Sequence, residues 1–197
     1  MHTTQLTITK TPGRQALSMI EFSSIAAGLT ALDTITKIAE VEILSATTIC
    51  PGKYMILFCG GLSEVNASLE AARQIPCKIA EFLLGSPHPD IFPAISASPT
   101  LPTKTPIGLI ETYSGAAAIK AADTAAKTAW VNLVEIRIVQ GMCGKSTVLF
   151  AGELAAVSAA LEAAKKEAAH VEQLLDTVLI PNPDDKMIAA MSLRLQH

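Results

Sequence analysis

The sequence has few aromatic and few charged side chains, and it contains no long apolar run. Aromatic residues make up 4% of the 197 residues and charged residues 17%, whereas 50% of the chain is hydrophobic. No segment reaches the roughly 18 apolar residues that a membrane-spanning helix needs. An apolar surplus without such a segment is typical of a chain that hides surface against other subunits. We therefore expect an obligate oligomer with no membrane partner.

Signals for nucleic-acid binding, export and disulfide bonding are also missing. The net charge is −3 and no basic patch stands out, which argues against a nucleic-acid partner. Residues 1–15 are polar and threonine-rich, without the apolar core of a secretory signal, and we expect a flexible extension. The four cysteines form no CxxC pair. In a reducing cytosol they are expected to be free thiols, core residues or metal ligands.

Sequence patterns of common enzymes are absent as well. The chain has no phosphate-binding loop, no dinucleotide-binding glycine pattern and no nucleophile elbow, so we expect no enzyme.

Single cysteine and aromatic residues outside these patterns are expected to serve packing. Cys59 and Cys77 are expected in the core or an interface. Tyr113 and Trp130 are likewise expected to be packing residues.

What the chain does contain is one module in two copies. The segment from Glu21 matches the segment from Glu111 at an offset of 90 residues, which grows to 92 and then 94 further along. The matches include Asp33 with Asp123, Lys37 with Lys127, Gly52-Lys53 with Gly144-Lys145, and Pro87-His88-Pro89-Asp90 with Pro181-Asn182-Pro183-Asp184. We expect domains over 16–95 and 106–190, joined by a linker over 96–105 and followed by a tail over 191–197.

Each copy has the pattern of an α/β (α+β) fold. Apolar periodicity predicts strand, helix, strand, strand, helix and a closing strand, which is the ferredoxin-like split βαβ plan. The expected strands are 16–21, 42–49, 54–59 and 78–84 in the first copy, and 106–111, 132–139, 146–151 and 174–180 in the second. The expected helices are 24–39, 62–75, 114–129 and 154–170, with Ser24 and Ser114 as N-caps.

Both copies resemble the bacterial microcompartment shell domain in its unpermuted form. The resemblance rests on the strand–helix opening (18–21 and 108–111), the Asp-x-x-x-Lys helix, the Gly-Lys turn, and the glycine-ended strand before an alanine-rich helix. Two such domains in one chain are similar to the tandem class, in which three chains form a pseudohexameric tile. The resemblance implies a structural protein in a microcompartment shell of the bacterial cytoplasm, with a homotrimer and other shell proteins as its partners.

The segment Thr48-Ile49-Cys50-Pro51-Gly52-Lys53 resembles the pore loop of the T-type shell proteins of propanediol-utilisation compartments. The resemblance implies that three Cys50 thiolates hold one [4Fe–4S] cluster per trimer on the axis. Three symmetric thiolates also suit a [3Fe–4S] cluster or zinc. The pore-lining residues would be Ile49, Cys50, Pro51, Gly52 and Lys53 with Met142, Cys143, Gly144 and Lys145 from the second copy. Cys143 is a spare ligand, a redox partner or only a small loop residue.

The family's tile-edge residues match less evenly. Lys37 and Lys127 correspond to the family's edge lysine, whereas the family's edge arginine is replaced by His88 and Asn182. The function implied is a shell tile whose cluster passes electrons, or is exchanged, across the shell with an encapsulated or cytosolic redox enzyme. The alternatives are a cluster-free tile with a gated metabolite pore and a soluble cluster-carrying redox protein.

Overall fold

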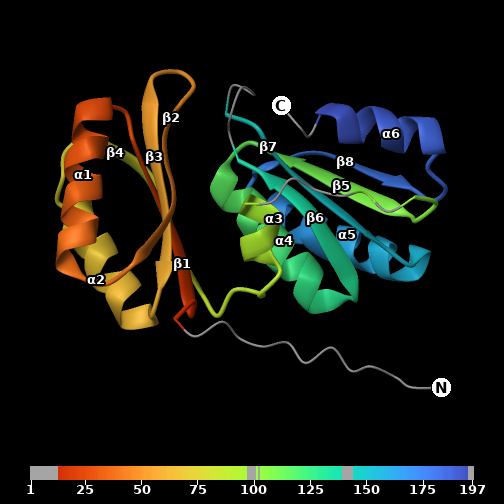
Figure 1. The fold of residues 1–197 in the computed structure, drawn as a ribbon, viewed down its shortest axis with the longest axis horizontal. Helices are drawn as coiled ribbons and strands as arrows, with labels where there is room; N and C mark the ends of the chain where they lie inside the picture. The colour runs from red at the N-terminus through yellow and green to blue at the C-terminus, as the bar shows by residue number, and fades with distance from the viewer. Residues whose placement is uncertain (1–12, 97–100, 102, 139–143, 195–197) are drawn as a thin grey trace.

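The chain folds into two similar units, each built on a four-stranded antiparallel sheet (Figure 1). The computed structural model describes residues 13–96, 101, 103–138 and 144–194, with side chains as far as Met191. The strand orders are β2-β3-β1-β4 and β6-β7-β5-β8. The two orders are equivalent, so the duplication predicted from the sequence is confirmed, as is the ferredoxin-like plan of each unit.

The element boundaries follow the predicted ones closely. The first unit contains β1 (Ala16–Phe22), α1 (Ile25–Ile38), β2 (Glu42–Ile49), β3 (Lys53–Gly60), α2 (Leu62–Arg73), β4 (Lys78–Gly85) and α3 (Ile91–Ser96). The second contains β5 (Ile107–Thr112), α4 (Gly115–Thr128), β6 (Val131–Arg137), β7 (Ser146–Gly152), α5 (Leu154–His170), β8 (Leu174–Ile180) and α6 (Asp185–Arg194). The helices α3 and α6 are additional to the elements predicted from the sequence.

Local sequence explains where the paired helices α1 and α4 begin. The Ser24 hydroxyl accepts the Ala27 N–H at 3.3 Å, and the Ser114 hydroxyl accepts the Ala117 N–H at 3.3 Å. A serine N-cap satisfies one of the backbone N–H groups left unpaired in the first turn. The predicted caps are therefore confirmed, and they start the two helices at equivalent places of the repeat.

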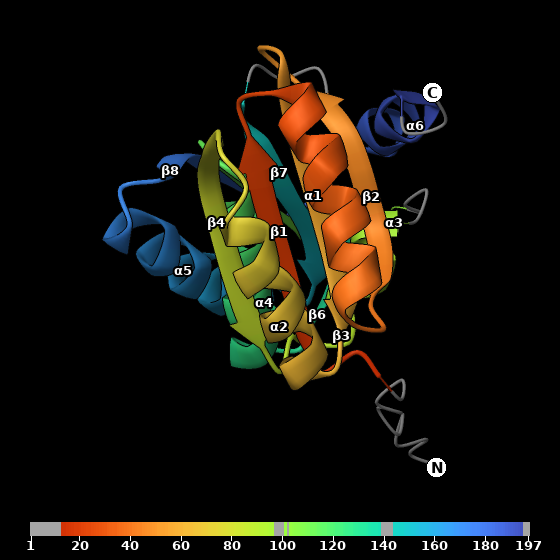
Figure 2. The ribbon, with the colours of Figure 1, turned by 90° about the vertical axis from the view of Figure 1, so that its left-hand side faces the viewer.

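The two units are stacked so that helices alternate with sheets. Helices α1 and α2 cover one face of the first sheet, and its other face turns toward α3 and α4 of the stack (Figures 1 and 2). The buried cluster there combines Leu17, Met19 and Phe82 of the first sheet with Ala118 and Ile119 of α4. The far face of the second sheet packs against α6 through Ile188. The largest core thus spans both units.

Two aromatic residues differ from the sequence prediction. Trp130 is 87% exposed and Tyr113 is 54% exposed, so in the single chain neither is a packing residue. Both lie at junctions, Tyr113 directly after β5 and Trp130 directly before β6, where the side chain leaves the sheet. No helix in the described part of the chain is long and apolar enough to span a bilayer.

Candidate functional site

The turn between β2 and β3 presents Cys50 to solvent. β2 and β3 pair in antiparallel register as far as Ile49 opposite Lys53, which leaves Cys50, Pro51 and Gly52 to form the turn. Cys50 is an exposed free thiol and Ile49 beside it is buried. Gly52 has φ +73°, a left-handed conformation that favours glycine. The turn therefore fixes the backbone on both sides of an accessible sulfur.

A buried carboxylate supports the base of this turn. Lys53 Nζ lies 3.9 Å from Glu21 Oε2, and the Glu21 side chain is largely buried on β1. Burial raises the pKa of Glu21 above its ordinary value, and the nearby Lys53 charge lowers it in part. Glu21 thus forms an ion pair with Lys53 at the base of the turn.

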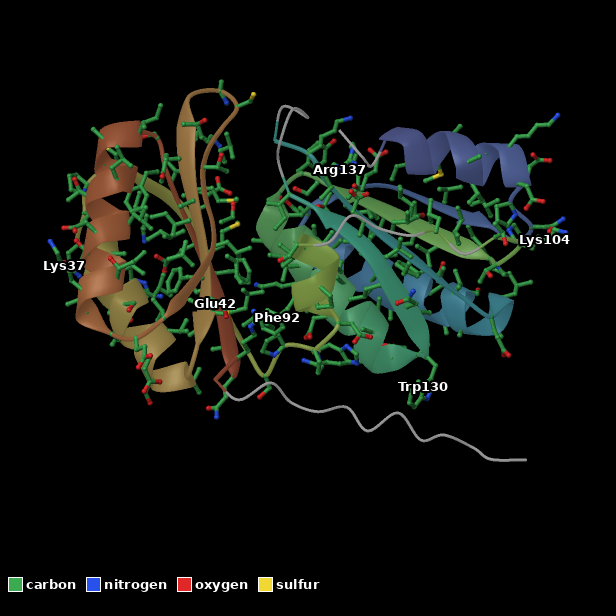
Figure 3. All side chains as sticks on the ribbon, viewed as in Figure 1. Lys37, Glu42, Phe92, Lys104, Trp130 and Arg137 are labelled. Atoms are coloured by element: carbon green, nitrogen blue, oxygen red, sulfur yellow. The ribbon has the colours of Figure 1, made fainter. Side chains whose placement is uncertain are left out.

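The equivalent turn of the second unit is described only in part. Gly144 has φ +97° and Lys145 is exposed, whereas Met142 and Cys143 lie outside the described residues. The β2–β3 turn and the Arg137 end of β6 point to the same end of the molecule (Figures 1, 2 and 3). Arg137 pairs with Thr147, so Gly144 and Lys145 of the second copy lie at the same end of the stack as the β2–β3 turn.

Of the other described cysteines, Cys59 is buried and Cys77 is exposed, so the expectation of a core position for Cys77 is wrong in the single chain. Cys59 is buried, as expected, with its Sγ 3.6 Å from Glu42 Oε2. Burial, assisted by the Glu42 charge, raises the pKa of Cys59 to about 12. Cys77 is an exposed thiol at φ +69°, at the start of β4. Within the residues described for one chain, no three His, Cys, Asp or Glu side chains are grouped so as to hold a metal ion.

One of the predicted edge lysines joins the two units. Lys127 Nζ lies 2.5 Å from Asp123 Oδ2 and donates to the Ser86 carbonyl at 2.9 Å. Asp123 Oδ1 accepts the His88 N–H at 2.7 Å. The loop after β4 is therefore tied to α4 by both ends of an Asp-x-x-x-Lys pair. Sequence reasoning found the spacing, which places both side chains on one helix face, but missed this contact.

The equivalent pair on α1 makes no such contact. Lys37 Nζ lies 2.6 Å from Asp33 Oδ2, and both side chains are mostly exposed. Asn182, the counterpart of His88, is exposed in the loop after β8. The structure thus brings Lys127 and Asp123 to the loop that contains Ser86 and His88. In contrast, α1 and β8, the elements of the other pair, lie at opposite sides of the molecule (Figure 1).

Comparisons with known proteins agree with the fold. The BMC domain model matches residues 16–87 and 106–183. The chain is 32% identical over 175 residues to the bacterial microcompartment shell protein PduT of Citrobacter freundii, covering 88% of this chain and 95% of that one. It is 27% identical over 191 residues to the carboxysome assembly protein CcmO of Synechococcus elongatus, covering 89% of this chain and 68% of the relative.

Solved structures give the same result. A microcompartment protein from Desulfitobacterium hafniense superimposes with a TM-score of 0.83 at 41% identity, covering 87% of this chain and 97% of that one. A fused permuted hexameric shell protein of the RMM microcompartment superimposes with a TM-score of 0.57 at 21% identity, which shows a shared fold. The chain belongs to the BMC-domain family and is a structural shell protein of bacterial microcompartments, which assembles with other shell proteins in the bacterial cytoplasm.

Proposed function

We propose that three copies of this chain close into a ring of six domains, a shell tile whose axis is lined by the β2–β3 turns. The observation that carries the proposal is an asymmetry between the paired helices. Ile119 of α4 is 0% exposed, while its counterpart Leu29 on α1 is 53% exposed. Ile119 belongs to the cluster that α4 shares with the first sheet. Leu29 would be buried in the same way against the second sheet of another copy.

The second sheet shows the complementary asymmetry. Phe82 pairs with Met19 in the first sheet, and Val178 pairs with Leu109 at the equivalent place in the second. Phe82 is 6% exposed and Val178 is 45% exposed. The second sheet therefore has an uncovered apolar surface where the first sheet has a covered one. Two matched surfaces of this kind form a head-to-tail contact, which repeats around an axis until the ring closes.

Charged residues follow the same rule. Asp123 and Lys127 contact the loop after β4, whereas Asp33 and Lys37 face solvent in the single chain. In the ring, Asp33 and Lys37 would meet the loop after β8 of the next copy, where Asn182 replaces His88. On this proposal Lys37 and Lys127 serve first between domains of one tile, and their free surface remains for neighbouring tiles.

The ring would bring three exposed Cys50 thiols to one axis. Within the described residues of one chain, no set of His, Cys, Asp or Glu side chains is grouped for a cluster. An exposed thiol on a fixed turn suits a site completed by symmetry, and thiolates are the usual ligands of iron–sulfur clusters. We therefore propose Cys50 as the ligand of one [4Fe–4S] cluster per ring. When bound, the cluster would supply one-electron chemistry at the axis, for electron transfer or cluster exchange across the shell with a redox enzyme.

The protein's own contribution to this site is positional. Gly52 allows the tight turn, buried Ile49 anchors it to the sheet, and Lys53 is held by Glu21 at its base. These features position the backbone of the turn that carries Cys50. A tile of this kind would be a structural and redox component of the shell, and we propose no catalytic residue.

Cys50→Ala and Cys77→Ala provide a matched test, because both remove an exposed thiol. We expect the wild type, prepared without oxygen, to contain about four iron and four sulfide per three chains, as one [4Fe–4S] cluster requires. Cys77→Ala should retain both and Cys50→Ala should lose both while keeping the wild-type mass in solution. Iron and sulfide analysis with EPR spectra makes the comparison. Loss of iron in Cys77→Ala alone would contradict Cys50 as the ligand. No iron in reconstituted wild type would contradict the cluster and favour a metabolite pore.

A further inference from the structure

The chain's one tryptophan is exposed at the end of the molecule opposite the Cys50 turn. Trp130 lies at the start of β6 and Arg137 at its other end, and the Trp130 side chain points away from the body (Figure 3). At 87% it is the most exposed of the large apolar side chains that are described. Tryptophan is enriched at protein interfaces because its ring is apolar and its N–H is a donor. If the Cys50 turns face the axis of a tile, Trp130 lies at the tile perimeter.

The same end of the first domain carries a hollow. This cavity of about 770 Å³ lies between the chain entering β1, the start of β2 and the start of α2. Gly60 and Gly61 form part of its wall, and Leu62 beside them is 50% exposed. Gly60 leaves its part of the wall without a side chain, whereas the Glu64 carboxylate lies over Gly61. The wall is therefore partly apolar and partly acidic, and the volume of the hollow accommodates a large side chain.

The charged part of the hollow suits an indole ring. Arg14 lines the cavity and its guanidinium donates to Glu42 at 2.9 and 2.6 Å. The Arg14 guanidinium also lies over the Phe92 ring, 4.9 Å from the ring centroid. A fixed guanidinium can stack on an aromatic face, and the carboxylates of Glu40 and Glu42 are acceptors for an indole N–H. The hollow thus offers an indole ring both a stacking partner and a hydrogen-bond acceptor.

The repeat places the tryptophan and the hollow at equivalent positions. Trp130 follows the C-cap Ala129 of α4, and Glu40, which lines the hollow, follows the C-cap Ala39 of α1. In a ring of six domains, three first domains alternate with three second domains. The domain directly across the ring from a first domain is therefore always a second domain. Tiles of one orientation, placed side by side, therefore meet first domain to second domain at every edge.

We infer that Trp130 of one tile docks into the Arg14–Glu40 hollow on the first domain of a neighbouring copy of the same tile. The contact joins two different surfaces, so it extends into a sheet rather than closing on itself. It rests on the proposed ring and adds the edge contact between rings. It also explains why a chain with so few aromatic residues keeps its one tryptophan in water when alone.

The fluorescence of Trp130 tests the inference without labelling, because no other tryptophan contributes. We expect rings in dilute solution to emit at long wavelength and to be quenched by acrylamide. Sheets collected by centrifugation should emit at shorter wavelength and resist quenching. Analytical ultracentrifugation of the same dilute sample reports the ring separately, so failure of the ring is recognised as failure of the proposed function.

Variants identify the two sides of the contact. Trp130→Ala, on one side, and Leu62→Glu, on the other, should each raise the protein concentration needed for sheets by at least about tenfold, as for an interface hot spot. Tyr113→Ala removes an exposed aromatic at the far end of β5 and should leave that concentration unchanged.

Three results would overturn the inference. The first is a blue-shifted emission already present in isolated rings, which would place Trp130 inside the ring. The second is sheets whose tryptophan stays quenchable. The third is wild-type rings that form no sheet alone and do so only with other shell proteins, which would replace the second copy by a different partner.

Discussion

At the scale of single residues, identical cysteine side chains acquire different chemistry from their surroundings. Cys50 and Cys77 are exposed, whereas Cys59 is buried beside Glu42. Sequence context predicted the division only for Cys59, which follows five apolar residues of a strand. Exposure of Cys50 depends on the turn geometry. The neighbours of Cys77, Pro76 and Lys78, do not predict its φ of +69° or its exposure.

The buried thiol should resist alkylation. Because burial raises the pKa of Cys59 to about 12, its reactive thiolate forms only at far higher pH than in an ordinary cysteine. At about pH 8, near the ordinary thiol pKa, iodoacetamide should modify Cys50 and Cys77 of the metal-free protein and leave Cys59 intact. Modification of Cys59 should increase as the pH rises toward its pKa of about 12, or when the protein unfolds. Peptide mass spectrometry measures all three sites, and equal rates for Cys59 and Cys77 at about pH 8 would refute this assignment.

At the scale of elements, the two copies pack their first helix on the sheet in different ways. A Cβ added to Gly28 of α1 would clash with the Tyr54 side chain. At the equivalent places the second copy has Ala118 on α4 and Ser146 on β7. In the first copy a glycine on the helix faces the large Tyr54 on the strand. In the second copy the larger Ala118 is accompanied by the small Ser146.

This volume exchange predicts coupled effects of substitution. Gly28→Ala should destabilise the chain by about 1–3 kcal/mol, because the added methyl group enters a filled space. In the double variant Gly28→Ala/Tyr54→Ser the clash is gone, so its loss of stability should be smaller than the sum of the single losses. Urea unfolding of the three variants gives the comparison. Strictly additive losses would show that the helix does not contact Tyr54 as described.

Most elements could be predicted because their apolar spacing is regular, and serine N-caps mark the start of α1 and α4. The exceptions are α3 and α6, which are short or follow a proline-containing loop, and α3 itself contains Pro93. These helices are stabilised by what they cover: Ile91, Phe92 and Ala94 of α3 are buried in the core shared by both units. Such burial comes from tertiary packing, which local sequence patterns do not report.

At the scale of the whole molecule, the duplication was visible in the sequence but the packing of the two copies was not. The contacts of Lys127 with the Ser86 carbonyl and of Asp123 with the His88 N–H join residues far apart in the chain. The exposure of Trp130 also depends on tertiary structure, because it lies directly before β6 at an end of the molecule. The difference in exposure between Ile119 on α4 and Leu29 on α1 becomes informative only when the packing of α4 on the first sheet is known.

The central claim, that α1 covers the second sheet of another copy, is tested most directly by the mass in solution of three proteins. The wild type should have three times the 20.7 kDa mass of one chain. Leu29→Lys should fall to the single-chain mass, because it would bury an unpaired charge in the contact. Thr30→Lys should stay trimeric, since the second domain of the same chain already has Lys120 at the equivalent position. A single-chain mass for the wild type, or a trimeric Leu29→Lys, would contradict the ring.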